Sequence, residues 1–456
     1  MKLRPQSMLE GPLLPAIIRY TIPIILTSIL QLLFNAADLV VVGRFCGSLS
    51  VGAVGATGSI TNLVVNLFIG LSTGAGVSVA HALGSRDNKL VHRTVHTSVA
   101  VSVISGIILT IVGISLAETL LIMMGTPENV LALSSVYMRI YFGGMLFNMV
   151  YNYCSSILRA AGDTRSPLVM LTIAGVLNVV LNVIFVTVFH MNVAGVALAT
   201  TISQAVSAVL VIIVLSRRED ACRLNWKKLR IYAQPLLKIL RIGVPAGIQG
   251  SIFAISNVII QSSVNSFGEV VVSGMAAAGN IEGFIYVTQN AFYQATVNFV
   301  GQNVGAKQYK RVNRTVWTAM GCVAVAGMIV GGLAYGFGSS LLSIYITDSP
   351  EAIAYGVRRM LYVCVPYFLC GLMEVTTGAL RGMGASLSTM VLSIVGVCGF
   401  RIGWIMTVFQ IPEYHTLESL FFSYPLSWTI TFLVQLVAFI LVFRKKQRQV
   451  ESELAA

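Results

Sequence analysis

The chain has 456 residues, of which 56% are hydrophobic and only 10% are charged, and its formal net charge is +13. Soluble domains carry about 25% charged residues, so this composition excludes an ordinary soluble fold and predicts a protein embedded in lipid. Because a membrane span needs about 20 apolar residues, about 12 spans would leave only short loops and no separate ATPase domain.

Twelve apolar stretches are predicted to form membrane-spanning helices. In chain order they cover residues 15–43, 50–82, 94–117, 131–158, 166–189, 194–216, 237–265, 270–303, 314–343, 352–380, 387–410 and 418–443. The expected class is therefore an all-α membrane protein with 12 transmembrane helices. The sequence contains no GxxxxGK[ST] or HExxH motif and no CxxC pair, so it predicts no enzyme, no metal site and no cofactor.

The positive charges predict the orientation of the chain. Of the 30 Lys and Arg residues, most lie in the two tails and in alternate loops. The largest group begins in the linker at 217–236. By the positive-inside rule, the basic face of the membrane protein is cytoplasmic, so both termini are expected in the cytoplasm. The basic residues need no nucleic acid to explain them, and we interpret the linker's charge as a surface for anionic lipid.

The sequence repeats itself once across the linker. Arg93-Thr94-Val95 recurs as Arg314-Thr315-Val316, and Pro23 recurs as Pro245. The predicted domains are an N-lobe at 1–216, the basic linker at 217–236 and a C-lobe at 237–456 with a basic tail. Six spans in each half predict two parallel bundles with pseudo-two-fold symmetry about the membrane normal, an arrangement typical of transporters.

Three carboxylates fall in the interior of predicted spans, where each costs at least about 2.5–3.5 kcal/mol to insert. We interpret Asp38 as functional, with a structural hydrogen bond as the alternative. For Glu282, a functional and a structural role are both open. The alternative for Glu374 is an ion pair with Arg381 on the same helix.

Uncharged polar residues add a second pattern. Asn178 and Asn182 share one helix face, and Thr200 lies on the next span. With Asp38 they are predicted to form either an oxygen-lined pocket for a small cation or a hydrogen-bonded surround for a protonatable Asp; interhelical packing is the alternative. Pro23 is predicted to be a hinge in the first span.

Further polar and aromatic side chains are predicted to line a substrate cavity together with two of the acids. They are Gln31, Asn35, Tyr141, Asn152, Asn257, Gln261, Glu282, Tyr286, Gln289 and Glu374.

These features together resemble the multidrug and toxic compound extrusion (MATE) transporters, in particular the prokaryotic DinF-like branch. The resemblance is carried by the repeated spans, by Pro23 with Asp38, and by "LRAAGDTRSP" at 158–167, "VGQNVGAKQ" at 300–308 and "LRGMG" at 380–384. It implies export of organic, often cationic, compounds driven by entry of H⁺ or Na⁺, with a bent first helix.

The resemblance also implies a coupling site in the N-lobe. Its aspartate, asparagine and threonine correspond to Asp38, Asn178 and Thr200, whereas the family's second acid corresponds to Asn182. With one carboxylate instead of two, a bound Na⁺ would be less fully neutralised, and a proton could not be shared between two acids.

The sequence thus predicts a secondary active multidrug antiporter that works by alternating access, with small organic substrates and the lipid bilayer as its partners. One alternative is a flippase for lipid-linked oligosaccharides, although its cavity would be strongly cationic. A membrane-embedded transferase and a passive channel are further alternatives. The absence of metal and diphosphate motifs disfavours the transferase.

Overall fold

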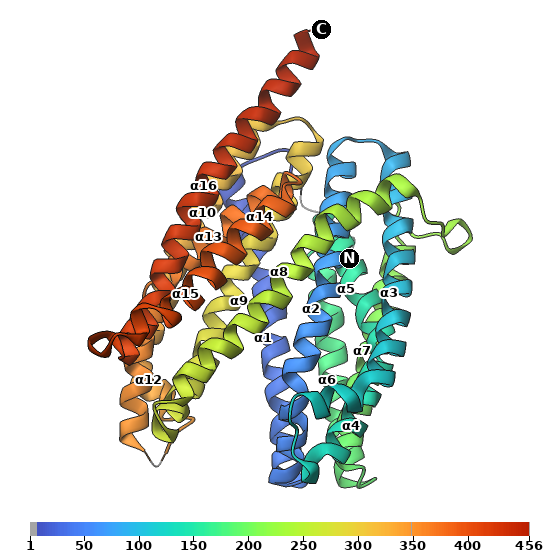
Figure 1. Ribbon diagram of the computed structural model, residues 1–456. Helices are drawn as coiled ribbons and strands as arrows, with labels where there is room; N and C mark the ends of the chain where they lie inside the picture. Colours follow the sequence, from blue (N-terminus) through green and yellow to red (C-terminus); the bar gives the residue numbers. More distant parts are fainter. Residues whose placement is uncertain (1–6, 348, 456) are drawn as a thin grey trace. The chain divides into compact units, whose positions relative to one another are not determined.

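The computed structural model describes residues 7–347 and 349–455, and all regular secondary structure in these ranges is helical (Figure 1). Ten stretches are long and apolar enough to cross a membrane, and two pairs of shorter helices, each bent by 46°, pass the same test together. If each bent pair is one span, the described residues contain the twelve predicted spans. The all-α membrane fold is confirmed.

The helices follow the predicted order. In the first half they are α1 (Leu13–Phe45), α2 (Ser48–Gly84), α3 (Asn88–Met123), α4 (Glu128–Gly143), α5 (Met145–Ala160), α6 (Arg165–Thr187) and α7 (Asn192–Ser216). In the second half they are α8 (Ala233–Asn265), α9 (Glu269–Gly305), α10 (Tyr309–Gly336), α11 (Gly338–Leu342), α12 (Pro350–Val363), α13 (Tyr367–Gly382), α14 (Ser386–Ser393), α15 (Phe400–Met406) and α16 (Leu417–Ala455). Short 3₁₀ turns occur at 226–228, 408–410 and 412–414, and a π-helical segment covers 394–399.

Two predicted spans are broken rather than continuous. The span predicted at 131–158 bends between α4 and α5 at Gly144, and that predicted at 352–380 bends between α12 and α13 just before Tyr367. Pro366 accounts for the second bend, because proline removes a helix hydrogen bond and clashes with the preceding turn. Gly144 lies at the first bend, and glycine is one of the residues at which helices commonly kink.

Contacts divide the described chain into two compact units. Unit 1 comprises Leu26–Gly247, and unit 2 comprises Ser7–Ile25 together with the chain from Ile248 to its end. The changes from one unit to the other therefore fall inside α1 and α8, two or three residues after Pro23 and Pro245. The predicted domains, by contrast, change at the linker, and that boundary stays a prediction.

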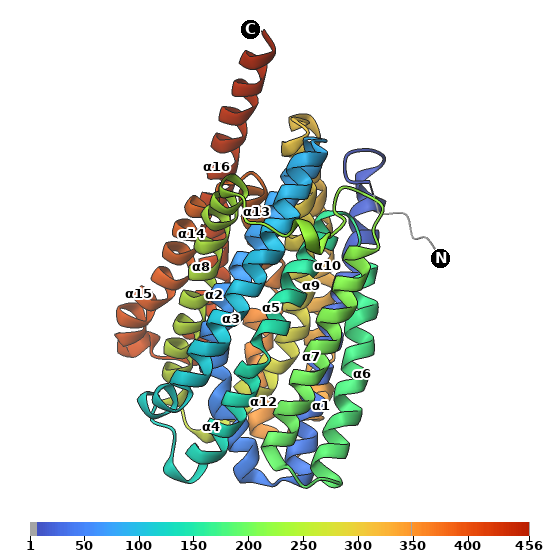
Figure 2. The same cartoon turned by 90° about the vertical axis from the view of Figure 1, so that its right-hand side faces the viewer.

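The beginning of α8 belongs to unit 1 because its glycines approach those of α2. A Cβ atom at Gly70 would lie 2.1 Å from the backbone N of Gly247, and one at Gly74 would lie 2.7 Å from the backbone N of Gly243. Only glycine permits backbones to approach so closely, as in the small-residue contacts of membrane helices. Elsewhere in unit 1, α6 and α7 follow one another across a short loop and lie side by side (Figure 2).

In unit 2, the segment before α1 is fixed to α9 and α10. The Arg311 guanidinium donates hydrogen bonds to the backbone oxygens of Met8, Glu10 and Gly11 at 2.9–3.2 Å. Tyr20 then packs edge-on against Phe299, with ring centroids 5.4 Å apart. The first part of α1 is thereby anchored within unit 2. Lys2 and Arg4, in the N-terminal tail, lie outside the described residues.

Candidate functional site

A polar cavity of about 120 Å³ lies within unit 1 among α1, α5, α6 and α7. It is lined by Gln31, Phe34, Asn35, Asp38, Asn148, Tyr151, Asn152, Leu171, Ala174, Gly175, Asn178, Thr200, Ser203, Gln204 and Ser207. Asp38 is the one acidic or basic residue in this lining. The structure thus brings Gln31, Asn35, Asn152, Asn178 and Thr200 of the predicted site together with Asp38.

Asp38 is held by hydrogen-bonding side chains from α6 and α7. The Asn182 amide donates to the Asp38 carboxylate and also faces the Asn178 Oδ1 at 3.3 Å. The Asn178 amide reaches the Thr200 hydroxyl at 3.3 Å, and that hydroxyl also interacts with Asp38. Asn178 and Asn182 are one helical turn apart and share a face of α6, so Asn182 meets the carboxylate while Asn178 links Asn182 to Thr200. The four predicted coupling residues form one connected group.

The charge of Asp38 has no ionic counterpart in its neighbourhood. Within 7–347 and 349–455, no Lys, Arg or His side chain lies within ion-pair distance of it. The Asn182 Oδ1 is buried and has no hydrogen-bond partner among the same residues. A carboxylate with amide and hydroxyl neighbours can accept a proton. It can also bind a hard cation, because such cations prefer oxygen ligands.

A close helix contact places Asp38 at the cavity. A Cβ atom at Gly175 on α6 would lie 1.8 Å from the Phe34 ring on α1. The missing side chain at Gly175 therefore makes room for Phe34, one turn before Asp38. This contact sets the distance between α1 and α6 about two helical turns before Asn182, which bonds to the carboxylate.

The sequence interpretation missed the polar face of α7. Ser203, Gln204 and Ser207 line the cavity with Thr200, and their spacing of three, four and seven residues puts them on one helix face. That spacing was readable in the sequence. The Tyr141 ring, by contrast, does not line the cavity: it stacks on Tyr137 with ring centroids 6.1 Å apart, and both rings are within electrostatic range of Asp38.

The remaining predicted site residues belong to unit 2. Glu282 forms a hydrogen-bonded ion pair with the Arg359 guanidinium at 2.8 Å, which balances its charge. Gln289 is fully buried, and its side chain lies against Gly327 of α10 and Gly371 of α13. The structure thus places both side chains in helix packing.

Glu374 lies on α13, where it is buried and within electrostatic range of Arg381. Arg381 itself donates to the Tyr293 hydroxyl and to Gln249, so its hydrogen bonds go to neutral groups. Tyr286 is 42% exposed. Asn257 and Gln261, both exposed, point away from the core of unit 2, and the Gln261 amide bonds to Asn265 at 3.0 Å. None of the four predicted residues in this paragraph belongs to the cavity of unit 1.

These features define a multi-pass membrane protein with a polar cavity inside a helix bundle. The MatE family model matches residues 23–184 and 245–405, so the chain belongs to this family, whose members are transporters. The two matched segments start 222 positions apart, at Pro23 and Pro245, and end 221 apart, which agrees with the repeat found in the sequence. The predicted family is confirmed.

Curated relatives and solved structures cover nearly the whole chain. The chain is 28% identical over 386 residues to "Probable multidrug resistance protein YpnP" of Bacillus subtilis, with 85% of this chain and 86% of that protein covered. It is 25% identical over 438 residues to "Probable multidrug resistance protein YoeA" of the same organism, with 94% of each covered. A MATE crystal structure in complex with MaL6 has a TM-score of 0.91, 21% identity, and coverage of 98% of this chain and 100% of that one; this likeness supports the fold.

Proposed function

We propose that the protein is a multidrug efflux antiporter, which exports organic, often cationic, compounds in exchange for H⁺ or Na⁺. Membership of a transporter family and the multidrug resistance names of its relatives support export of several compounds. The observation that supports coupling is the placement of Asp38, the one carboxylate among the residues that line the unit 1 cavity, where the Asn182 amide and the Thr200 hydroxyl bond to it.

The coupling cycle follows from the chemistry of that group. Uptake of a proton or cation at Asp38 cancels the charge of the carboxylate. It thereby weakens the hydrogen bonds that the Asn182 amide and the Thr200 hydroxyl make with that carboxylate. The first helix then rearranges about Pro23, two residues before the chain passes from unit 2 to unit 1. Exchange requires the ion and the organic substrate to bind the two conformations with different affinities.

The orientation in the membrane is part of the proposal. The positive-inside rule favours a cytoplasmic location for the linker and for the end of α16, where Arg444, Lys445, Lys446 and Arg448 cluster. In a bacterial cytoplasmic membrane, the ion would then reach Asp38 from outside and the organic substrate from inside.

Uptake of ethidium into inverted vesicles tests the proposal, with a proton gradient and a sodium gradient imposed separately. Uptake driven by one gradient is expected in the wild type and is expected to be lost in Asp38→Asn. Glu118→Gln is the matched control, since its carboxylate forms only an exposed ion pair with Arg139. Full activity in Asp38→Asn would remove Asp38 from the mechanism, and no uptake under either gradient would contradict antiport of this class of substrate.

A further inference from the structure

The linker between α7 and α8 is folded against unit 1. The backbone N–H of Leu224 donates to the oxygen of Leu215 in the last turn of α7 at 3.1 Å. His96 of α3 contacts the backbone N and O of Asn225, both at 3.1 Å, and the Thr97 hydroxyl accepts from the N–H of Tyr232 at 3.1 Å. The linker is therefore held at the level of the helix ends.

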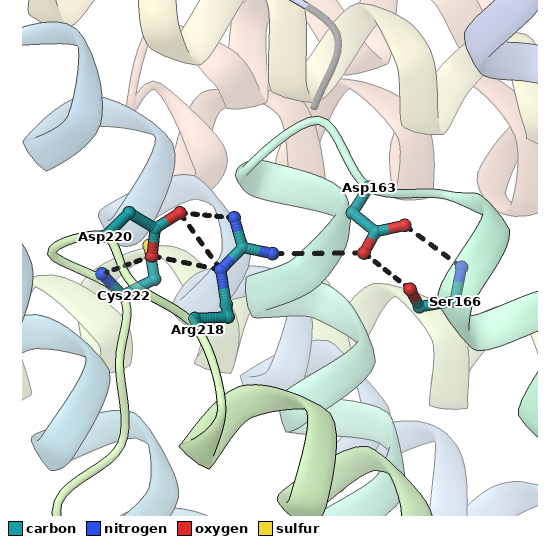
Figure 3. A network of polar contacts seen from close by, with 5 residues as sticks. All are labelled: Asp163, Ser166, Arg218, Asp220 and Cys222. Atoms are coloured by element: carbon teal, nitrogen blue, oxygen red, sulfur yellow. Dashed lines mark hydrogen bonds and ion pairs between the residues drawn. The ribbon is translucent and has the colours of Figure 1, made fainter. Parts of the chain in front are cut away.

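A polar network fixes the start of the same linker (Figure 3). Arg218 bonds to Asp220 and lies 3.9 Å from Asp163, whose carboxylate accepts from the backbone and hydroxyl of Ser166 at the start of α6. Asp220 also accepts from the backbone N–H of Cys222, a buried residue. The polar groups on the side of the linker that faces the helices therefore have their hydrogen-bond and ionic partners within unit 1.

The outward-facing side of the linker combines a tryptophan with basic residues. Trp226, Lys227 and Lys228 form a 3₁₀ turn in which the Asn225 side chain caps the backbone N–H of Lys227 at 3.1 Å. The Trp226 side chain is 52% exposed, although a large apolar ring in water is unfavourable. Tryptophan side chains concentrate at the headgroup level of membranes, where the ring contacts the apolar core and the indole N–H contacts water.

The charges on this side are not balanced by acids. Five exposed basic residues occur between α7 and α8: Arg217, Arg223, Lys227, Lys228 and Arg230. Within the described ranges none of these five residues forms a salt bridge. The segment contains two acids, and one of them, Asp220, already pairs with Arg218. A fixed cluster of this kind attracts anions at an interface.

We infer that the turn at Trp226–Lys228, with Arg230, is a binding site for anionic lipid headgroups of the adjacent leaflet. The turn immediately follows a helix of 25 residues, which at about 1.5 Å per residue is longer than the hydrocarbon core, so the linker lies in the headgroup region. Trp226 enters the interface, and Lys227, Lys228 and Arg230 bind the lipid phosphates. This site does not depend on the transport proposal.

Fluorescence quenching by spin-labelled lipids tests the inference. The full-length protein is placed in vesicles of phosphatidylcholine and phosphatidylglycerol at a 3:1 ratio, with the spin label on one lipid or the other. The Trp226 signal is obtained as the difference between wild type and Trp226→Phe. We expect labelled phosphatidylglycerol to quench this signal at least about twofold more than labelled phosphatidylcholine, because each basic residue near the surface favours anionic lipid by about fivefold.

Three variants make the test specific. Neutralising Lys227, Lys228 and Arg230 together to Gln should bring the quenching ratio to about one, whereas Lys227→Arg with Lys228→Arg should retain it. Replacing Lys445 and Arg448 of α16 by Gln should leave the ratio unchanged. Equal quenching by the two labelled lipids in wild type, or an unchanged ratio in the triple Gln variant, would overturn the inference.

Discussion

The Asn182 amide donates to the Asp38 carboxylate across 144 positions of sequence, while the Oδ1 of the same buried side chain has no hydrogen-bond partner among the described residues. The donated bond stabilises a charged carboxylate. The Oδ1 belongs to the same amide as the donating nitrogen, so it lies close to the bond with Asp38. We propose that this oxygen becomes a ligand when a cation binds at Asp38.

Asn182→Asp is expected to increase the dependence of transport on Na⁺. The substitution places a second carboxylate where the amide meets Asp38, and two acids neutralise a bound Na⁺ more fully than one. The measurement is the Na⁺ concentration dependence of ethidium uptake in proteoliposomes at fixed pH. Asn182→Ala, which removes the donor without adding charge, should lower uptake by about 10-fold or more, the cost of losing a hydrogen bond to a charged group. A wild-type Na⁺ response in the Asp variant would count against ion binding here.

Gly175→Ala is expected to displace α1 from α6 and to reduce transport. The new Cβ would lie 1.8 Å from the Phe34 ring, and overpacking of this kind costs about 1–3 kcal/mol. Thermal unfolding of the purified protein and ethidium uptake measure the two effects. Phe34→Leu in the same chain should restore part of both, because a smaller side chain leaves room for the methyl group. An additive loss in the double variant would show that the two residues do not meet.

The ion pair between Arg359 and Glu282 is expected to be structural. Their side chains are only 12% and 15% exposed, so Arg359→Met leaves a buried carboxylate without its partner, which costs about 3–5 kcal/mol. Arg359→Met with Glu282→Gln should recover most of the stability, and the double variant should still transport. Thermal unfolding and uptake measured in parallel separate this case from Asp38, whose neutral variant is expected to unfold normally but not to transport.

The spans and the Asp38 group could be predicted because their signals are local. A carboxylate in an apolar run is costly, and Asn178 and Asn182 at a spacing of four must share a face. The breaks at Gly144 and Pro366 were not predicted. Apolar composition runs through both breaks and predicts continuous spans. Pro366 is a local signal of a bend that the composition obscured, whereas glycine is common in membrane helices and does not by itself mark a break.

Contacts between residues that are far apart in the sequence could not be predicted from local sequence patterns. Nothing near Glu282 in the sequence indicates that Arg359, 77 positions later, neutralises it. Gln289 is similarly polar in sequence but lies against Gly327 and Gly371, because glycines from two other helices leave space for it. The basic linker was predicted from its charge alone, whereas its attachment to His96 and Thr97 depends on tertiary contacts.

Arg218→Gln is expected to release the linker and to expose Cys222. Burial and the nearby charge of Asp220 raise the pKa of the Cys222 thiol to about 12 from its ordinary value of 9.0, although Arg218 acts in the opposite direction. Since the thiolate is the reactive form, the docked thiol should react with maleimide at pH 8 about 1000-fold more slowly than an exposed thiol.

The measurement is the rate of maleimide labelling in a chain whose other cysteines are replaced by alanine. Arg218→Gln should accelerate labelling, and Arg217→Gln, an exposed neighbour, should not. A raised pKa in the docked state also means that docking favours the neutral thiol. Docking should therefore be fully stable below about pH 9 and should weaken as the pH rises towards 12. Equal labelling rates in the Arg218 variant and the parent chain would show that the Arg218 network does not hold the linker in place.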